Sequence, residues 1–427
     1  MKEIRFGTDG IRGIYGEDLT EETAYALGAA LAKRGDILLG RDDRPSSPAL
    51  ARAIACGAHA SGGGIHAVGL TTTPALYYLL TISDCSYAVM VTASHNPPAH
   101  NGLKVFTKSG KPTERDRRAL ESEMRSVRPS TCPVFTYRET QDISPYTEYL
   151  KERIRPLDGI TVVLDCANGA GSAFKGLYRE LGAHEISINA EGDGARINVN
   201  CGALHPEACA REVLKRHADL GVSIDGDGDR IVLVTRDGEI LDGDHITYIL
   251  ACRMQEKGRL KKSTVAMTVM TNGGVLRSLS ERGIRVISTA VGDAALAAAM
   301  REEGLNLGGE QSGHVILGDY LATGDGLLTG AVLMQSFLEE GEIEKTPPPV
   351  VYPQVLLNVE VGDKSLAEHP EIRQLAKELK EEMNAGRILL RASGTEDLLR
   401  IMVEHPDAGI AKSVAERLRE AILRKTK

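Results

Sequence analysis

The chain has 427 residues, a net charge of −8, and 42% hydrophobic and 26% charged residues. These values are typical of a soluble globular protein, and the length predicts roughly three or four domains. The negative charge, 4% aromatic residues and lack of tryptophan argue against nucleic acid or an anionic membrane as a partner. Seven scattered cysteines predict reduced thiols and no zinc site. The amino end has no signal-like apolar region and no run approaches transmembrane length, so we expect a cytoplasmic protein.

The first part of the chain alternates apolar strand-like runs with helix-like segments such as 21–32 and 48–61. This alternation predicts a mostly parallel sheet with helices on its faces. A glycine-rich stretch at 6–13 precedes it, and Arg12 in that stretch could hold a phosphate through two donors. Taken alone this signal is weak, because glycine turns with an arginine are common.

An apolar run at 87–91 leads into the sequence Thr-Ala-Ser-His-Asn-Pro at 92–97. The run suits a buried strand of a parallel sheet, and such sheets place ligand chemistry in the loop beyond a strand's carboxyl end. Ser94 falls in that loop with His95 as a polar neighbour, and the prolines that follow prevent a helix. Lys104 lies on the expected return strand. A serine here could instead be an ordinary turn former, and in isolation that interpretation would be preferred.

A second α/β segment begins near Gly159 and ends in the sequence Asp-Gly-Asp-Gly-Asp-Arg at 225–230. The carboxylates of Asp225, Asp227 and Asp229 would repel one another unless they share a cation. A helix-loop-helix calcium site is excluded because its distal glutamate is missing and both flanks have strand patterns. Three oxygen ligands with open positions predict Mg²⁺. Together with Ser94, this site predicts phosphoryl transfer through a phosphoserine.

A third segment begins near Asp244, so the order of strand, glycine-bearing turn and helix starts three times and predicts an architectural repeat. Within it Glu310, Ser312 and His314 alternate, and in an extended segment they would project to one face. A carboxylate and a hydroxyl suit the hydroxyl groups of a sugar, and His314 could carry a proton. A surface turn with accidental polarity is an equally good interpretation.

The proline-rich stretch 344–349 predicts a linker before a smaller α+β domain. In that domain, two arginines, two hydroxyls and a glycine make a binding nest for a phosphate dianion. These residues are Arg391, Ser393, Gly394, Thr395 and Arg400. The predicted domains span residues 1–152, 153–243, 244–346 and 351–427.

These four motifs occur in the order found in the α-D-phosphohexomutases, and the chain resembles that family over its whole length. The resemblance implies three related α/β domains of mixed or parallel sheets and a smaller carboxy-terminal α+β domain around a central cleft. It implies that Ser94 is the phosphoserine and that the three aspartates hold Mg²⁺ together with its phosphate. Positions that line the reacting centre or bind the sugar phosphate match Arg12, His95, Lys104, Arg230, Glu310, Ser312, His314, Arg391, Ser393, Gly394, Thr395 and Arg400.

Within the family, Gln311 and the stretches 197–202 and 268–272 resemble the bacterial phosphoglucosamine mutases. That branch usually has an arginine and an aromatic residue where this chain has Ala294 and Ala295. The resemblance implies interconversion of glucosamine 6-phosphate and glucosamine 1-phosphate for cell-envelope precursors, with glucosamine or glucose 1,6-bisphosphate as primer. It implies a kinase or sugar bisphosphate that phosphorylates Ser94, and a monomer or homodimer. A mutase for glucose or mannose phosphates and a non-catalytic sugar-phosphate binder are the alternatives.

Overall fold

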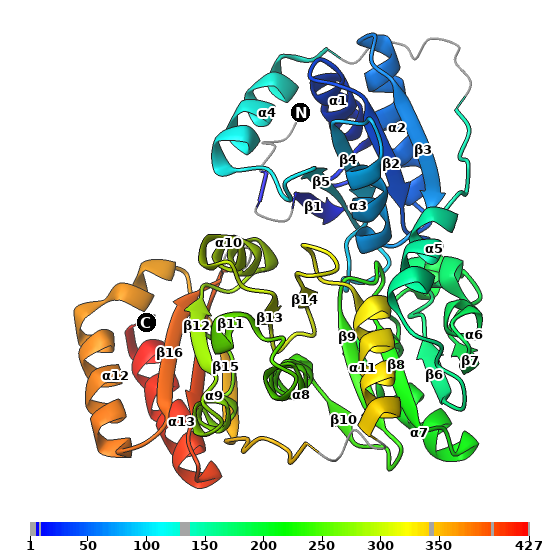
Figure 1. Ribbon diagram of the computed structural model, residues 1–427. Coiled ribbons are helices and arrows are strands. Elements are labelled where there is room, and N and C mark those ends of the chain that lie inside the picture. The colour runs from blue at the N-terminus through cyan, green and yellow to red at the C-terminus, as the bar shows by residue number, and fades with distance from the viewer. Residues whose placement is uncertain (1–5, 8–9, 129–136, 341–345, 394–396, 426–427) are drawn as a thin grey trace. The chain divides into compact units, whose positions relative to one another are not determined.

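A computed structural model describes residues 6–7, 10–128, 137–340, 346–393 and 397–425 (Figure 1). The chain forms two compact units, Met1–Met270 with Ile284–Pro347, and Thr271–Gly283 with Pro348–Lys427. The division after Pro347 falls in the predicted linker, whose residues 344 and 345 lie outside the described residues. The four-domain boundaries expected from the sequence stay predictions.

The first unit contains three sheets that share one plan. In each, a first strand lies parallel to a second and a third, and the third pairs antiparallel with a fourth. The predicted architectural repeat is therefore confirmed, and the sheets are mixed because the last connection is a hairpin. The strands are β1 (Ile11–Ile14), β2 (Ile37–Arg41), β3 (Ile65–Leu70), β4 (Tyr87–Val91), β5 (His100–Thr107), β6 (Thr161–Asp165), β7 (His184–Ile188), β8 (Leu220–Ile224), β9 (Ile231–Thr235), β10 (Ile240–Leu241), β11 (Thr264–Thr268), β12 (Arg285–Thr289), β13 (Leu307–Gly309) and β14 (Val315–Leu317).

The hairpin between the third and fourth strands is the part of this plan that matters for function. It carries the Ser94 loop between β4 and β5, the aspartate loop between β8 and β9, and residues 310–314 between β13 and β14. Three motifs that are far apart in the sequence thus occupy equivalent places in three related sheets. The carboxyl end of a strand is where such sheets bind ligands.

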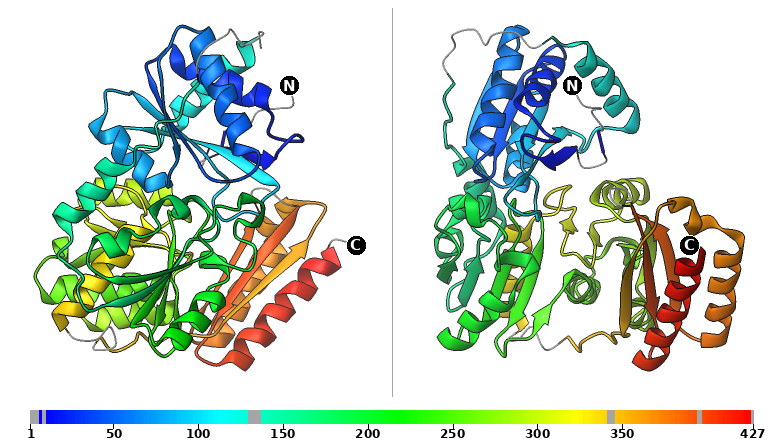
Figure 2. Two further views of the ribbon diagram at one scale, coloured as in Figure 1. Left: turned by 90° about the vertical axis from the view of Figure 1, so that its right-hand side faces the viewer. Right: turned by 180° about the vertical axis from the view of Figure 1, so that it is seen from behind.

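Helices α1 (Glu21–Ala32) and α2 (Ser47–Ala60) lie side by side next to the first sheet (Figure 2). Thr20 caps α1 by accepting a hydrogen bond from the Thr23 amide, and the helix has the bounds predicted from the sequence. The two helices approach closely because Gly28 has no side chain. A Cβ atom at this position would lie 2.0 Å from the Ile54 carbonyl oxygen. This packing buries a core of small and branched side chains on one face of the sheet.

Successive side chains of β2 point to opposite faces of that sheet, and a different helix covers the other face. Leu39 joins the core under α2, whereas a Cβ atom at Gly40 would meet Leu76 of α3 (Thr73–Ile82). The other helices of the first unit are α4 (Glu114–Ser126), α5 (Ser144–Arg153), α6 (Leu177–Glu180), α7 (Glu207–Arg216), α8 (Gly243–Glu256), α10 (Asp293–Glu303) and α11 (Gly326–Glu340). Although α11 follows β14 in the chain, it packs against β8 and β9, so it joins the second and third sheets.

The second unit is a three-stranded antiparallel sheet in the order β15-β17-β16, and its core also contains side chains of the helices at 370–383 and 408–425. Its elements are α9 (Gly273–Glu281), β15 (Gln354–Glu360), α12 (Pro370–Met383), β16 (Arg387–Ala392), β17 (Leu398–Glu404) and α13 (Ala408–Lys425). The start of α9 is held in this unit, because the Gly273 amide donates to Glu404 at 2.9 Å.

The cysteines of the described residues only partly follow the sequence prediction. Cys85, Cys166, Cys201, Cys209 and Cys252 are buried free thiols. Cys56 on α2 is disulfide-bonded, so the prediction of a reduced thiol is wrong at that residue. Among the helices of the described ranges, none combines the length and the apolar character that a membrane span requires.

Candidate active site

Ser94 lies in the loop between β4 and β5 and is only 2% exposed. Its backbone has a φ of 53°, a left-handed conformation that is uncommon for a residue other than glycine. The Thr92 hydroxyl oxygen accepts a hydrogen bond from the Ser94 amide at 2.9 Å. The Ser94 hydroxyl donates to Asp225 Oδ2 at 2.6 Å and lies 3.3 Å from His95 Nδ1. The fold therefore joins the predicted serine to the predicted aspartate loop of the next sheet.

The aspartate loop places its three carboxylates within one small buried volume. Asp225, Asp227 and Asp229 are 0%, 0% and 5% exposed, and one oxygen of each lies within 4.8 Å of the others. Gly228, with a φ of 74°, allows the tight curl. Thr73 of α3, next to the first sheet, anchors the loop, because its hydroxyl donates to Asp227 Oδ2 at 2.6 Å.

Lys104 on β5 supplies a positive charge to this cluster. Its Nζ atom lies 2.7 Å from Asp227 Oδ2 and 2.8 Å from Asp229 Oδ2, and the side chain is 2% exposed. Burial opposes ionisation of Asp229, but attraction from the neighbouring cations, Lys104 first and also Arg230, outweighs it and holds the Asp229 pKa well below its usual range. Burial, and then repulsion from Asp229 and Asp227, raises the pKa of Asp225 well above its usual range.

The arrangement fits a small divalent cation. Asp227 Oδ1 and Asp229 Oδ1 are buried and accept no hydrogen bond from the described residues. Such oxygens are costly unless a cation or another donor reaches them. Hard oxygen ligands of this kind suit Mg²⁺, whose remaining positions water or phosphate can complete. A second group of ligand atoms within 4.8 Å joins Asp229 to Asp293 and His314.

The two histidines have different surroundings. Burial, and then repulsion from Arg230 and Arg12, lowers the pKa of His95 to about 3, so its imidazole is neutral at neutral pH. His314 is 3% exposed, and its Nε2 atom accepts a hydrogen bond from the Gly324 amide at 3.2 Å. In the neutral ring, the proton of His314 therefore resides on Nδ1.

Two predicted arginines border this cluster. Arg12 lies on β1, not in a loop, and its Nη1 atom donates to Asn96 Oδ1 at 3.5 Å. Arg230 follows the aspartate loop, with its Nε atom 3.9 Å from Asp229 Oδ1 and its amide donating to Asp225 at 3.2 Å. Both guanidinium groups therefore come from elements next to the serine and aspartate loops.

The expectation that Glu310, Ser312 and His314 project from an extended segment is wrong. These residues form a tight turn between β13 and β14, closed by a bond from the Gly313 amide to the Glu310 carbonyl at 3.0 Å. Gly313 takes a φ of 92°, so the turn needs its glycine. Glu310 and His314 are buried, whereas Ser312 is exposed. The Glu310 carboxylate accepts a bond from the Gly292 amide at 2.8 Å, which holds the loop before α10.

In the second unit, the predicted phosphate site is centred on two arginines. Arg391 of β16 and Arg400 of β17 are opposite each other in the sheet register. Like charges opposite each other destabilise a sheet unless an anion joins them. Burial, and then repulsion from Arg400, lowers the pKa of Arg391. Ser393 is buried next to them. The predicted Gly394 and Thr395 lie outside the described residues.

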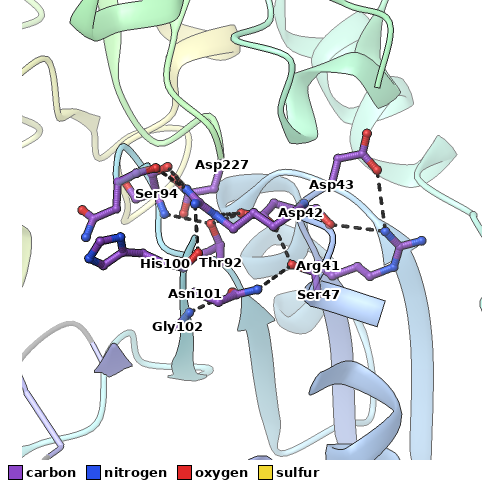
Figure 3. Close-up of polar contacts among 12 residues, drawn as sticks. Arg41, Asp42, Asp43, Ser47, Thr92, Ser94, His100, Asn101, Gly102 and Asp227 are labelled. Carbon is purple, nitrogen blue, oxygen red and sulfur yellow. Dashed lines mark hydrogen bonds and ion pairs between the residues drawn. The ribbon is translucent and has the colours of Figure 1, made fainter. Parts of the chain in front are cut away.

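The sequence analysis missed Asp42, which organises the loop around Ser94. Asp42 is 0% exposed and accepts hydrogen bonds from the hydroxyls of Ser47 at 2.6 Å and Thr92 at 2.7 Å (Figure 3). Asn101 donates to the Ser47 hydroxyl at 2.9 Å and extends this network to β5. The signal was present as the sequence Arg-Asp-Asp-Arg at 41–44, which begins at the last residue of a buried strand.

Four domain models of one family match the chain. They describe phosphoglucomutase/phosphomannomutase alpha/beta/alpha domain I at residues 3–129, domain II at 144–238, domain III at 242–347 and the C-terminal domain at 356–421. Phosphoglucosamine mutases of Saccharopolyspora erythraea and Limosilactobacillus reuteri are 41% and 38% identical to this chain, with 98% of each chain covered.

Two solved structures have the same fold at low sequence identity. A phosphoglucomutase/phosphomannomutase family protein from Burkholderia thailandensis has a TM-score of 0.82 and 22% identity, covering 99% of this chain and 98% of that chain. The Aspergillus fumigatus N-acetylphosphoglucosamine mutase, solved in complex with GlcNAc-6P and magnesium, has a TM-score of 0.69 and 18% identity, covering 100% of this chain and 96% of that chain.

Proposed function

The chain belongs to the phosphoglucosamine mutases of the phosphoglucomutase/phosphomannomutase family, and from this membership we propose that it interconverts glucosamine 6-phosphate and glucosamine 1-phosphate. The observation that carries the proposed mechanism is the 2.6 Å contact between the Ser94 hydroxyl and Asp225, within a buried cluster of three carboxylates. A serine in this position can carry a phosphoryl group beside a metal site.

The proposed reaction has two phosphoryl transfers. Phospho-Ser94 first gives its phosphoryl group to the C1 hydroxyl of glucosamine 6-phosphate; the bond from phosphorus to Ser94 Oγ breaks and a bond to the sugar oxygen forms. The hydroxyl proton leaves to a base, and the product is the 1,6-bisphosphate. This sugar reorients, and its C6 phosphate is transferred to Ser94, which leaves glucosamine 1-phosphate and the phosphoenzyme. The proton is returned to the C6 oxygen.

Asp225, Asp227 and Asp229 would hold Mg²⁺ together with the phosphate on Ser94. When bound, Mg²⁺ would offset the negative charge that develops on the transferred phosphoryl group. Lys104 lies between two of these carboxylates, so we assign it charge balance and not free proton exchange. His314 accepts a backbone bond at Nε2, so we assign its Nδ1–H the role of donor toward the sugar.

We assign the far phosphate of the substrate to Arg391 and Arg400. Two positive charges that face each other favour a bound anion, and a phosphate can accept hydrogen bonds from both guanidinium groups. The primer bisphosphate, the kinase, the supply of peptidoglycan precursors, the cytoplasmic location and the monomer or homodimer stay predictions from the sequence.

A mutase for glucose or mannose phosphates is the second candidate, and one feature favours it. Ala294, Ala297 and Ala298 of α10 line a cavity of about 310 Å³ next to His314. Small side chains at this place impose little shape selection on a sugar. A pocket of this kind discriminates between similar ligands by only about 1–3 kcal/mol.

The test compares turnover of glucosamine, glucose and mannose phosphates with Mg²⁺ and glucose 1,6-bisphosphate as primer. We expect the glucosamine compound to be preferred, and Ser94→Ala to remove turnover of all three. Ser61→Ala, at an exposed serine of the same sheet's helical layer, is the control and should retain activity. Full turnover by Ser94→Ala would refute the phosphoserine, whereas a preference for glucose or mannose phosphate would refute only the choice of sugar.

A further inference from the structure

Arg44 is a fully buried arginine whose five N–H groups all have acceptors. Its Nε atom donates to Asp42 Oδ2 at 2.9 Å. The other donors reach main-chain carbonyl oxygens of residues 92–100, which we call the serine loop. These carbonyls belong to Ser94 at 2.9 Å, Asn96 at 2.8 Å, His100 at 3.0 Å and Pro97.

The charge of Arg44 is balanced within the same network. Asp42 and Arg44 are both 0% exposed and form an ion pair, so the network adds no net charge near Ser94. Asp42 also accepts from the Thr92 hydroxyl, which in turn accepts from the Ser94 amide (Figure 3). The serine loop is thus held from its carbonyl side and its amide side by one buried pair.

Asn198 reaches the same loop from the second sheet's side. Its Nδ2 atom donates to the carbonyl oxygens of Ser94 at 2.9 Å and Asn96 at 3.2 Å, the two carbonyls that Arg44 Nη2 also contacts. Asn198 is 7% exposed and has a φ of 60°. Gly226 packs directly against the same loop. A Cβ atom at this position would lie 2.6 Å from the Ser94 carbonyl oxygen.

We propose that Arg44 and Asn198 are positioning residues that clamp the carbonyl oxygens of Ser94 and Asn96 and thereby hold the Ser94 hydroxyl against the aspartate loop. The left-handed backbone of Ser94 is costly and persists only where the surrounding contacts enforce it. Phosphoryl transfer in both directions requires the same oxygen to return to the same place, and a shift of about 1 Å can cost about a hundredfold in rate. This inference rests on the proposed function.

Two variants test the clamp. Asn198→Asp keeps the size of the side chain but replaces the donor with a carboxylate oxygen that faces two carbonyls. Arg44→Lys keeps the charge, but one ammonium cannot reach the separate acceptors that the planar guanidinium reaches. We expect kcat to fall about 10–100-fold in each, with KM within about twofold, because the change acts on Ser94 and not on the substrate.

Arg253→Lys is the matched control. Arg253 is 2% exposed and donates to Ser336 at 2.7 Å in another part of the first unit. It should lose stability like Arg44→Lys, but it should keep kcat when assayed well below its unfolding midpoint. The double variant should lose less than the product of the single losses, since both donors hold the same two carbonyls. A loss of kcat in the double variant equal to the product of the two single losses would overturn the clamp. Single variants that are folded and keep kcat within about twofold of wild type would also overturn it.

Two further readouts separate the clamp from the proposed function. Intact mass shows whether wild-type protein takes phosphate from glucose 1,6-bisphosphate; if it does not, the proposed function fails. Hydrogen exchange of the Ser94 and Asn96 amides reports the clamp independently of activity. We expect exchange to be at least about tenfold faster in both variants, with β4 unchanged. Unaltered exchange of these amides would overturn the inference.

Discussion

The substitution Lys104→Met removes the ammonium group from the buried carboxylate cluster and keeps an unbranched side chain of similar size. In the wild-type protein that group lies 2.7 Å and 2.8 Å from Asp227 and Asp229. The other oxygens of these two carboxylates accept no hydrogen bond from the described residues. Breaking a buried ion pair costs about 3–5 kcal/mol, because the remaining charge is left uncompensated. In a metal chelator we therefore expect the unfolding midpoint to fall by about 10 °C.

Mg²⁺ should reverse much of this loss, because Lys104 and the metal compensate the same carboxylates. We expect Lys104→Met to bind Mg²⁺ at least about tenfold more tightly than the wild type, which corresponds to about 1.4 kcal/mol. Thermal unfolding with chelator and with increasing Mg²⁺ measures both effects, and calorimetric titration measures the affinity directly. Lys108→Met, at an exposed lysine just beyond β5, is the control. If the variant and the wild type have equal unfolding midpoints in chelator, the argument that Lys104 compensates the buried charge is refuted. If Mg²⁺ stabilises both proteins equally, the claim that Lys104 and Mg²⁺ compensate the same carboxylates is refuted.

Three further changes test other parts of the molecule. Burial raises the pKa of Asp325 from 3.8 to about 6, so its protonated form stabilises the fold below pH 4 and this contribution is lost as pH rises through 6. The free energy of unfolding of Asp325→Asn minus that of the wild type should increase by about 3 kcal/mol from pH 4 to pH 7, as measured by urea unfolding. A difference that does not change with pH would contradict the assignment. Gly226→Ala forces a Cβ atom within 2.6 Å of the Ser94 carbonyl and should lower kcat about tenfold, whereas Gly362→Ala, which meets open space, should be neutral in the same assay. Arg391→Met relieves repulsion from Arg400, so KM for the sugar phosphate should rise about tenfold or more while the unfolding midpoint stays level or rises; an unchanged KM would remove Arg391 from the phosphate site.

Much of the candidate site follows from short patterns in the sequence. The loop that holds Ser94 was predicted because an apolar run precedes it and prolines follow it, and the aspartate loop because its carboxylates alternate with glycines. Ser94 became a catalytic candidate only in combination with the aspartate loop. The threefold repeat was predicted because strand, turn and helix recur in order. These inferences depend on interactions between near neighbours in the chain, and the three sheets confirm the architecture.

The turn at 310–313 shows where such patterns fail. Alternating polar residues predict a common face only in extended backbone. Here Gly313 adopts a positive φ and the chain reverses, so Glu310 and His314 are buried while Ser312 is exposed. The cross-strand pairing of β13 with β14 decides this, and pairing is not encoded in the spacing of three residues.

The sequence by itself determined the candidate residues for the chemistry: a serine after one strand, three aspartates after another, and a lysine on the return strand. Only the tertiary structure decided what holds them in place. Arg44 and Asn198 meet the Ser94 carbonyl from 50 and 104 residues away. A buried arginine must satisfy all its donors, but its partners are main-chain carbonyls, which every residue has. Sequence therefore cannot single them out, whereas the folded positions of the loops can.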